Sequence, residues 1–283
     1  MLKNVSKLAG LLLLLVLSFV YTDSVFDGAK KTDPVMKEII SYKNEHDVLG
    51  VEPVIEDDEM IIGYAGLVVD EDESYKNMKE EDKFDEEKIV FLESLPKTTI
   101  SKTYDYYIKQ GNPSKKEVAI IFKIDSSNKV DELLSLVAKH DVVINFFVDG
   151  TFLEKNVETG FSMVNLSCEI YNLGYNGNYQ KSMMSTTNNL IESITLKDSS
   201  FCLNDDKNDE AKKICKDKKM HTIMPTMSNP SLSELKSGLI KGAIIAYDLR
   251  DFSLDTFSMV IKTITSKGYK ITGLSSVVNE GLK

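Results

Sequence analysis

Residues that commonly hold transition metals are scarce in this chain of 283 residues. It has only three histidines, no two of which have the spacing of a metal-ligand pair, and its three cysteines include no CxxC pair. A histidine-based zinc site and a structural zinc site are therefore not expected. The histidines are His46, in a polar linker, His140, at the end of a predicted helix, and His221, at the start of a predicted strand.

Positive charge is also low. The chain has 34 Lys and Arg residues against 44 Asp and Glu residues, a formal net charge of −10. A nucleic-acid partner is not expected, because binding phosphates needs clustered cations. Most of the excess negative charge lies between Glu52 and Glu87, a stretch that contains 15 acidic residues and only three lysines. That stretch is interpreted either as a solvated acidic face or as a patch for a cation or a basic partner.

The longest apolar run is too short for a full bilayer span. Lys3 and Lys7 precede 14 mostly apolar residues, Leu8 to Tyr21. This order is typical of an export signal, with the positive flank in the cytoplasm. No convincing cleavage site follows, so residues 1–21 are predicted to be either a signal peptide or a membrane anchor, and the rest of the chain is expected to be extracytoplasmic.

An odd number of cysteines in an exported chain leaves at least one free thiol. The three are Cys168, Cys202 and Cys215. Cys202 and Cys215 could pair, but the spacing alone does not guarantee the geometry of a strand-to-helix disulfide.

The chain divides by pattern into four parts. Residues 1–21 are the signal or anchor, 22–50 a linker with room for one short helix, 51–112 a small acidic α/β unit, and 113–283 the main domain. In the main domain, seven short apolar runs alternate with six amphipathic helical patterns, which predicts a parallel sheet covered by helices. Seven strands in so few residues favour a distorted (β/α) barrel. Neither a GxGxxG motif nor a P-loop is present.

Two stretches carry a family resemblance. The segment AIIFKIDSSNKVDELLSLVAKHDVVINFFVDGTFLEKN, followed by CEIYNLGYNGNY, GAIIAYDLR and SKGYKITGLSSVV, resembles the polysaccharide deacetylase (NodB-homology) family over about residues 113–280. The segment GYAGLVVDEDESYKNMKEEDKFDEEKIVF, with YIKQGNPSKKEVA, resembles the sporulation-associated, YlxY-type branch, which is noted for a degenerate catalytic motif.

The resemblance implies zinc-assisted removal of an N-acetyl group from chitin-like or peptidoglycan sugars. A metal held by one Asp and two His would lower the pKa of its bound water from about 15.7 to about 7. A second Asp, held ionised by an Arg, would take the water proton, and a further His would protonate the leaving amine.

All six of these positions carry other residues here. The family's T-F-D-D-G turn falls on residues 121–125, its H-x-x-x-H motif on residues 173–177 and its R-P-P-x-G segment on residues 202–206. The base Asp corresponds to Lys123 and the metal-ligand Asp to Ile124. The two metal-ligand His correspond to Leu173 and Gly177. The Arg corresponds to Cys202 and the leaving-group His to Asp248. Ile, Leu and Gly side chains offer no lone pair, so the resemblance implies a pseudoenzyme without cofactor that binds cell-wall glycan or an envelope protein. The alternatives are an active N-deacetylase with a rebuilt site and a scaffold that acts through its acidic unit.

Other groups could line a groove at the carboxyl ends of the strands. Asp125, Asp149 and Asp248 are interpreted either as a site for a hard cation or as solvated loop acids. Tyr171, Tyr175 and Tyr179 could stack on sugar rings or pack in the core.

Three further features have simpler alternatives. Lys123 could be a desolvated base, a packed lysine or a partner of Asp248. Cys202 could be a reactive thiol, a buried residue or half of a disulfide. The run Asn204–Glu210 has some features of a calcium loop, but it is more simply a turn whose Asn or Asp caps the helix that follows.

Overall fold

A computed structural model describes residues 30–125 and 129–282; the predicted signal or anchor lies outside these residues. The chain forms two compact units. Of the described residues, the first unit contains those up to Leu49 together with Gly66–Ser94, and the second contains Gly50–Ala65 together with those from Leu95 onward. Residues 51–112 therefore contribute to both units. Within the described ranges, no helix combines the length and the apolar character needed to span a bilayer.

The first unit combines two α-helices with a two-stranded antiparallel sheet. It contains α2 (Pro34–His46), β3 (Gly66–Val69), α3 (Glu71–Met78), the 3-10 helix η1 (Glu86–Lys88) and β4 (Phe91–Ser94). Asp33 and Asp70 cap the two α-helices by accepting hydrogen bonds from backbone N–H groups of the first turns. A small apolar cluster built from both helices and β3 holds the unit together. Much of the acidic run lies in this unit.

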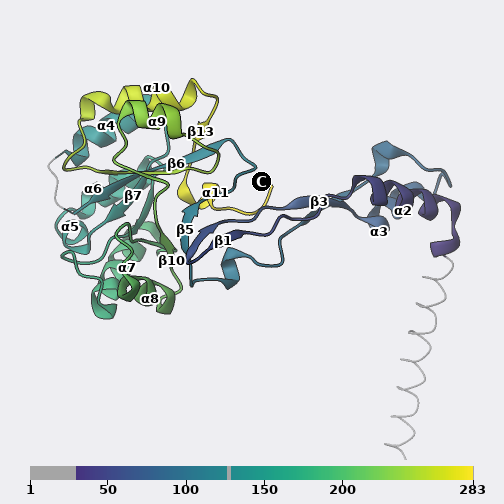
Figure 1. Cartoon of the computed structure of the whole chain (residues 1–283), viewed down its shortest axis with the longest axis horizontal. Coiled ribbons are helices and arrows are strands. Elements are labelled where there is room, and N and C mark those ends of the chain that lie inside the picture. The colour runs from purple at the N-terminus through teal and green to yellow at the C-terminus, as the bar shows by residue number, and fades with distance from the viewer. Residues whose placement is uncertain (1–29, 126–128, 283) are drawn as a thin grey trace, which may run out of the picture. The chain divides into compact units, whose positions relative to one another are not determined.

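The second unit contains an 11-stranded sheet that curls into an incomplete barrel (Figure 1). Neighbouring strands along it are β1 (Val54–Glu56), β2 (Glu59–Ile61), β5 (Tyr107–Gln110), β10 (His221–Ile223), β9 (Phe201–Leu203), β8 (Glu169–Asn172), β7 (Asn145–Val148), β6 (Glu117–Ile124), β12 (Ile244–Asp248) and β11 (Met227–Ser228). β13 (Lys270–Ile271) also pairs with β6. Apart from the antiparallel pair β1–β2, these strands run parallel to their neighbours.

Helices follow most of the parallel strands and lie around the outside of the sheet (Figure 1). The helices of this unit are η2 (Ile100–Lys102), α4 (Val130–His140), α5 (Gly150–Lys155), α6 (Val157–Asn165), α7 (Lys181–Thr195), α8 (Asp209–Asp217), α9 (Leu232–Gly238), η3 (Leu254–Thr256), α10 (Phe257–Thr265) and α11 (Leu274–Val277). Each of the seven predicted strands and six predicted helices of the main domain contains an element of the expected type. The alternating α/β pattern is thus confirmed, while α5, α11 and β11 were not predicted.

The two faces of the sheet have separate cores. On β6, Ile120, Phe122 and Ile124 belong to the outer cluster, which joins the sheet to the helices. Ala119 and Ile121 belong to the inner cluster, which also includes residues of α11. This alternation follows from the two-residue period of a strand. It decides which way each residue at the end of β6 points.

Buried polar side chains also link the strands of the sheet to α11 on its inner face. Asn145, fully buried on β7, donates a hydrogen bond to the carbonyl of Ile120 (3.0 Å) and accepts one from the backbone N–H of Leu274 (2.6 Å). One side chain therefore ties β7 to both β6 and α11. Losing such a group would leave buried backbone groups unpaired, which is costly.

Candidate functional site

The strand register places most of the family's functional positions on one rim. Asp248 on β12 lies beside Lys123 on β6, and Ile124 lies beside Val148 on β7. Val148 in turn lies beside Asn172 on β8, and Asn172 beside Cys202 on β9. Leu173 follows Asn172 directly. In a parallel sheet the carboxyl ends of the strands share one edge, so these positions lie along one rim, although their side chains do not all point the same way.

Lys123 forms an ion pair with Asp205, which follows β9. Its Nζ donates to Asp205 Oδ2 at 2.8 Å, and the two side chains are 20% and 31% exposed. Of the alternatives for Lys123, direct pairing with Asp248 is therefore wrong. Asp248 is held instead by Arg250, two residues further on, so its oxygens are already engaged.

Arg250 joins two of the three rim aspartates. Its Nε and Nη2 lie 3.1 and 2.8 Å from the two carboxylate oxygens of Asp248, and its Nη1 lies 3.0 Å from Asp125 Oδ2. The forked bond from Arg250 lowers the pKa of Asp248, against the opposing effect of burial. A hard cation at these carboxylates would have to displace the guanidinium. The sequence prediction missed Arg250, although its position two residues after Asp248 was a usable signal.

Ile124 points away from the groove. It has no exposed surface and belongs to the outer apolar cluster, among residues of the surrounding helices. The position that the family uses for its metal-binding Asp is therefore part of the hydrophobic core here.

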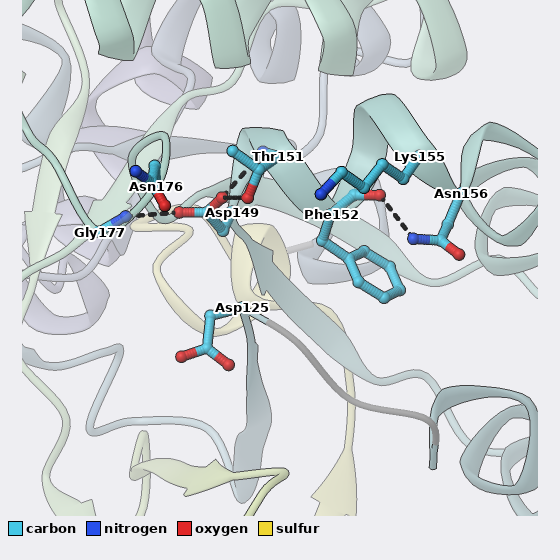
Figure 2. A pocket seen from close by; sticks show the side chains of 8 residues that line it. All are labelled: Asp125, Asp149, Thr151, Phe152, Lys155, Asn156, Asn176 and Gly177. Carbon is cyan, nitrogen blue, oxygen red and sulfur yellow. Dashed lines mark hydrogen bonds between the residues drawn. The ribbon is translucent and has the colours of Figure 1, made fainter.

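Asp149 acts as a structural cap. It is 2% exposed, and its Oδ1 accepts hydrogen bonds from the backbone N–H and the hydroxyl of Thr151 at the start of α5. Its Oδ2 accepts a bond from the Gly177 N–H at 2.9 Å, which ties α5 to the turn after β8 (Figure 2). Both carboxylate oxygens of Asp149 are engaged, so its side chain holds these loops together and is not a solvated acid.

The former histidine positions lie on and beside this turn. Leu173 is half-buried and packs against the inner cluster. Gly177 has a backbone φ of +67°, in the left-handed region that favours glycine. Neither residue can hold a metal.

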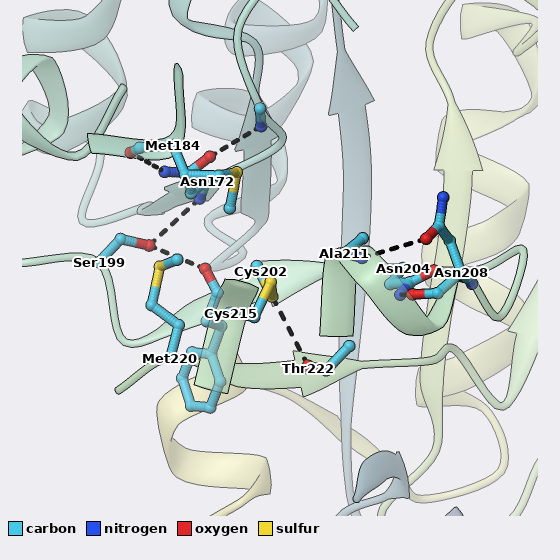
Figure 3. The surroundings of a disulfide bond; sticks show 12 residues. Asn172, Met184, Ser199, Cys202, Asn204, Asn208, Ala211, Cys215, Met220 and Thr222 are labelled. Atoms are coloured by element: carbon cyan, nitrogen blue, oxygen red, sulfur yellow. Dashed lines mark hydrogen bonds between the residues drawn. A yellow bond between two sulfur atoms is a disulfide. The ribbon is translucent and has the colours of Figure 1, made fainter. Parts of the chain in front are cut away.

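Cys202 is joined to Cys215 by a disulfide bond (Figure 3). Both are fully buried, and the bond connects β9 to α8 within an apolar cluster that includes Met184 and Met220. The family's Arg position is thus used for a cross-link and not for a reactive thiol. Cys168 is a free, buried cysteine, and burial raises the pKa of its thiol.

The three tyrosines differ in role. Tyr171 is buried in the inner cluster against Phe147 and Phe201 and donates a hydrogen bond to Glu169 (2.7 Å), so for this tyrosine the core-packing alternative is confirmed and the sugar-stacking alternative is wrong. It lies on β8, both faces of which are covered. Tyr175 is half-exposed, and its hydroxyl donates to Glu154 (2.6 Å). Tyr179 packs against the disulfide cluster.

The histidines lie on separate elements. His46 ends α2 and His140 ends α4, as predicted for the latter, with its Nε2 2.8 Å from the Ser258 hydroxyl. His221 is buried between the rings of Tyr104 and Phe201, and burial lowers its pKa to about 4. The described residues include no group of three His, Cys, Asp or Glu side chains placed to hold a metal ion.

The run Asn204–Glu210 forms a turn and a helix cap. The side chain of Asn208 accepts a hydrogen bond from the Ala211 N–H (3.1 Å) and caps α8, as predicted (Figure 3). Asn204 bonds to the backbone of Asn208 in both directions. These bonds give the predicted turn-and-cap role a direct structural basis.

A pocket of about 530 Å³ opens beside this rim. It is lined by Asp125, Asp149, Thr151, Phe152, Lys155, Asn156, Asn176 and Gly177 (Figure 2). Its walls combine carboxylate, amide, hydroxyl and ammonium groups with the ring of Phe152, which is only 8% exposed and belongs to the outer cluster. Such a mainly polar lining suits a ligand with many hydrogen-bonding groups, such as a sugar.

The zinc site implied by the resemblance does not fit these residues. The position of the ligand Asp is a core isoleucine, and the two histidine positions hold a half-buried leucine and a left-handed glycine. The nearby carboxylates of Asp125 and Asp248 share Arg250. No step of a metal-dependent hydrolysis can therefore be assigned to this rim.

No family model matches the sequence. Over 91% of its length the chain is 26% identical to the uncharacterised protein YlxY of Bacillus subtilis, 87% of which is covered. Among solved structures, it is similar to a family 4 carbohydrate esterase pseudoenzyme from Bacillus anthracis, with a TM-score of 0.66, 24% identity, and coverage of 87% of this chain and 95% of the other. A mutant of that pseudoenzyme with restored enzymatic activity gives a TM-score of 0.68 at 24% identity, covering 87% and 98% of the two chains.

The fold is also similar to that of a protein named as a deacetylase. A peptidoglycan N-acetylglucosamine deacetylase aligns with a TM-score of 0.55 and 17% identity over 64% of this chain and 96% of its own. The predicted resemblance to the polysaccharide deacetylases is confirmed, and at these identities the structural likeness establishes the fold.

Proposed function

We propose that this chain, which has the fold of the polysaccharide deacetylases, is a pseudoenzyme that binds a cell-wall glycan in its rim pocket without hydrolysing it. One observation carries the proposal. The positions that would hold the metal lie on the expected rim, but one is absorbed into the core and the others have no ligand atom. Without a cation-holding set, no water is activated by the family's route.

Glycan is the proposed ligand because of the pocket lining and of the relatives. The ring of Phe152 and the polar groups of Lys155, Asn156 and Asn176 surround the pocket. One protein of this fold is named for its action on peptidoglycan N-acetylglucosamine. A pocket that keeps sugar-compatible walls after losing its metal ligands is suited to binding alone.

We also propose that the protein acts outside the cytoplasm, in cell-wall or sporulation processes. The lysines and apolar run of residues 1–21 support export or membrane attachment. The Cys202–Cys215 disulfide supports an oxidising compartment. Peptidoglycan also lies on that side of the membrane. Cell fractionation with a protease-accessibility assay on intact cells tests the location, and protection of the barrel unit from external protease in wall-stripped cells would contradict it.

The absence of hydrolysis is tested with the purified full chain. We expect no stoichiometric zinc by elemental analysis and no acetate release from acetylated chitooligosaccharide or peptidoglycan. An active family 4 esterase, assayed in parallel, controls for substrate quality. Stoichiometric zinc together with acetate release would overturn the proposal in favour of a rebuilt N-deacetylase.

Glycan binding is tested with a matched pair of double variants. Lys155→Ala with Asn176→Ala removes two exposed polar side chains from the pocket lining. Lys139→Ala with Asn165→Ala removes the same two groups from exposed positions on α4 and α6. We expect the first pair to weaken peptidoglycan pull-down roughly fivefold or more, since each lost hydrogen bond costs about 1 kcal/mol, and the second to leave it unchanged.

The same experiment separates the scaffold alternative. If both double variants bind peptidoglycan equally well, the pocket is not the binding site. If the wild-type chain retains no peptidoglycan, glycan binding is excluded, and the acidic first unit becomes the candidate for the working surface.

A further inference from the structure

The two-stranded sheet of the first unit carries exposed apolar side chains on one face. Val68 on β3 is paired with Leu92 on β4, so these two side chains point to the same face, as a side chain at Gly66 would. A Cβ atom on Gly66 would lie 1.9 and 2.6 Å from the carbonyl oxygens of Val48 and Leu49, so that segment lies against this face. We call Val48, Leu49, Val68 and Leu92 the apolar face; Leu49 and Leu92 are 71% and 51% exposed.

The opposite face of this sheet is used by the unit itself. Val69 is buried there in the apolar cluster that joins β3 to α2 and α3. None of the four residues of the apolar face belongs to an apolar cluster of the described part of the chain. Single exposed apolar residues are ordinary, but a contiguous patch marks an interaction surface. A two-stranded sheet is also marginally stable alone, so cover on this face would stabilise the unit.

The first unit around the apolar face is strongly acidic. Its described residues include 15 Asp and Glu residues and eight lysines, a net charge of −7. Five of the lysines already form ion pairs with carboxylates of the same unit. Glu93 lies on β4 itself, and Glu86 and Glu87 lie in η1, which shortly precedes β4. A partner that reaches the apolar face therefore meets a negative surface.

This charge decides which kind of occupant fits. A second copy of the chain would bring the same negative unit to the same surface and would be repelled. Nucleic acid and an anionic lipid surface would be repelled for the same reason. A cationic segment with apolar side chains fits both properties, because its lysine or arginine groups complement the carboxylates while its apolar side chains cover the apolar face.

We propose that the apolar face of the first unit docks a short cationic and apolar segment of a partner protein. The segment packs its apolar side chains over Leu49 and Leu92, and its cationic groups interact with Glu86 and Glu87. This role does not depend on the rim pocket, so the two units bind different partners.

The probe is a fluorescein-labelled peptide in which lysine alternates with leucine, titrated with the full chain and followed by fluorescence anisotropy. One comparison peptide alternates lysine with serine and keeps only the charge; the other alternates glutamate with leucine and keeps only the apolar side chains. We expect the lysine–serine peptide to bind about tenfold more weakly or less, because it buries little apolar surface. The glutamate–leucine peptide should not bind, and added salt should weaken binding of the probe.

A double variant locates the apolar contact. Leu49→Ser with Leu92→Ser removes two exposed leucines from the apolar face and should weaken binding of the lysine–leucine peptide about tenfold or more. The matched control, Leu196→Ser with Ile240→Ser, removes two exposed apolar side chains from the second unit and should leave binding within about twofold of the wild type. All four side chains are exposed, so both variants should fold, and thermal melting of each checks this.

A second pair of variants tests the charge. Glu86→Gln with Glu87→Gln should weaken binding of the lysine–leucine peptide roughly threefold, since each exposed ion pair contributes little. Glu132→Gln with Glu210→Gln removes the same charge from exposed positions of the second unit and should have a smaller effect.

Four results would overturn the proposal. The first is no binding of the lysine–leucine peptide to the wild type, and the second is equal binding of the lysine–serine peptide. The third is an equal effect of a double variant and its matched control, in either pair. The fourth is a dimer of the chain alone, seen by sedimentation, that Leu49→Ser with Leu92→Ser disperses, since a second copy would then be the occupant.

Discussion

The rim of the barrel and its interior differ in how strongly each residue is coupled to the rest of the fold. On the rim, Lys123 and Asp205 form a partly exposed ion pair, and Arg250 is about half exposed. In the interior, Asn145 has no exposed surface and bonds to two other elements. Exposed pairs of this kind contribute little to stability, whereas buried groups are costly to disturb.

This difference indicates where the second unit tolerates substitution. Partly exposed rim residues such as Lys123 and Asp205 can be exchanged at low cost, because solvent screens their charges. The barrel depends instead on its two apolar clusters and on the polar groups that tie them together. Substitutions of buried and of partly exposed residues should therefore differ in their effect on stability.

The largest effect is expected for Ile124→Asp. The change places a carboxylate in the outer apolar cluster, and we expect it to lower the free energy of unfolding by about 4 kcal/mol or more at neutral pH. Chemical denaturation measures the loss. Ile124→Val, the control, should cost only about 1 kcal/mol. A loss below 1 kcal/mol for the Asp variant would mean that this position faces the groove.

Removal of the disulfide should have the next largest effect. The bonded cysteines are 13 residues apart, so the double change Cys202→Ala and Cys215→Ala should cost about 3 kcal/mol. Denaturation with and without reductant measures it. Reductant should destabilise the wild type and leave the double variant unchanged, while Cys168→Ala should respond to reductant like the wild type. A wild type insensitive to reductant would show that the bond does not support the interior.

Acid sensitivity should come in part from His221. Its pKa is about 4 when folded, against 6.5 when unfolded, because the ring is buried. The unfolded state therefore binds the proton first, and stability is lost as pH falls from about 6.5 to about 4, by about 2 to 3 kcal/mol. His221→Phe keeps a ring beside Tyr104 and should lose this part of the slope. Identical pH profiles for the two proteins would contradict the assignment.

The smallest effect is expected on the rim. Lys123→Ala breaks the partly exposed pair with Asp205 and should change stability by less than about 1 kcal/mol. A double-mutant cycle with Asp205→Ala isolates the pair. A coupling energy above 2 kcal/mol would mean that this rim pair contributes as much to stability as the buried groups of the interior.

Local pattern predicted most of the elements of the barrel. The apolar runs that became β6, β7 and β12 are nearly continuous, as expected for strands buried on both faces, and the cap at Asn208 follows from its position before a helix. Aligning the family's motifs also put most of the six corresponding positions at or just after strand ends, and the strand register brings those strand ends to one rim.

Side-chain partners were harder to predict. Lys123 meets Asp205 across 82 residues of sequence, and nothing local distinguishes that partner from Asp248. Tyr171, Tyr175 and Tyr179 are evenly spaced along the chain, yet Tyr171 lies in a covered strand and Tyr175 lies in a turn. Such differences depend on which elements pack over each strand, and this is a tertiary property.

The left-handed backbone at Gly177 bears on any attempt to engineer a metal site at this rim. A histidine there would have to adopt a conformation that costs an L-residue about 1 to 2 kcal/mol, before any metal arrived to compensate. An aspartate at residue 124 would meet the core at the same time. A metal site engineered here one substitution at a time would therefore pass through destabilised variants, so the changes would have to be introduced together with compensating ones.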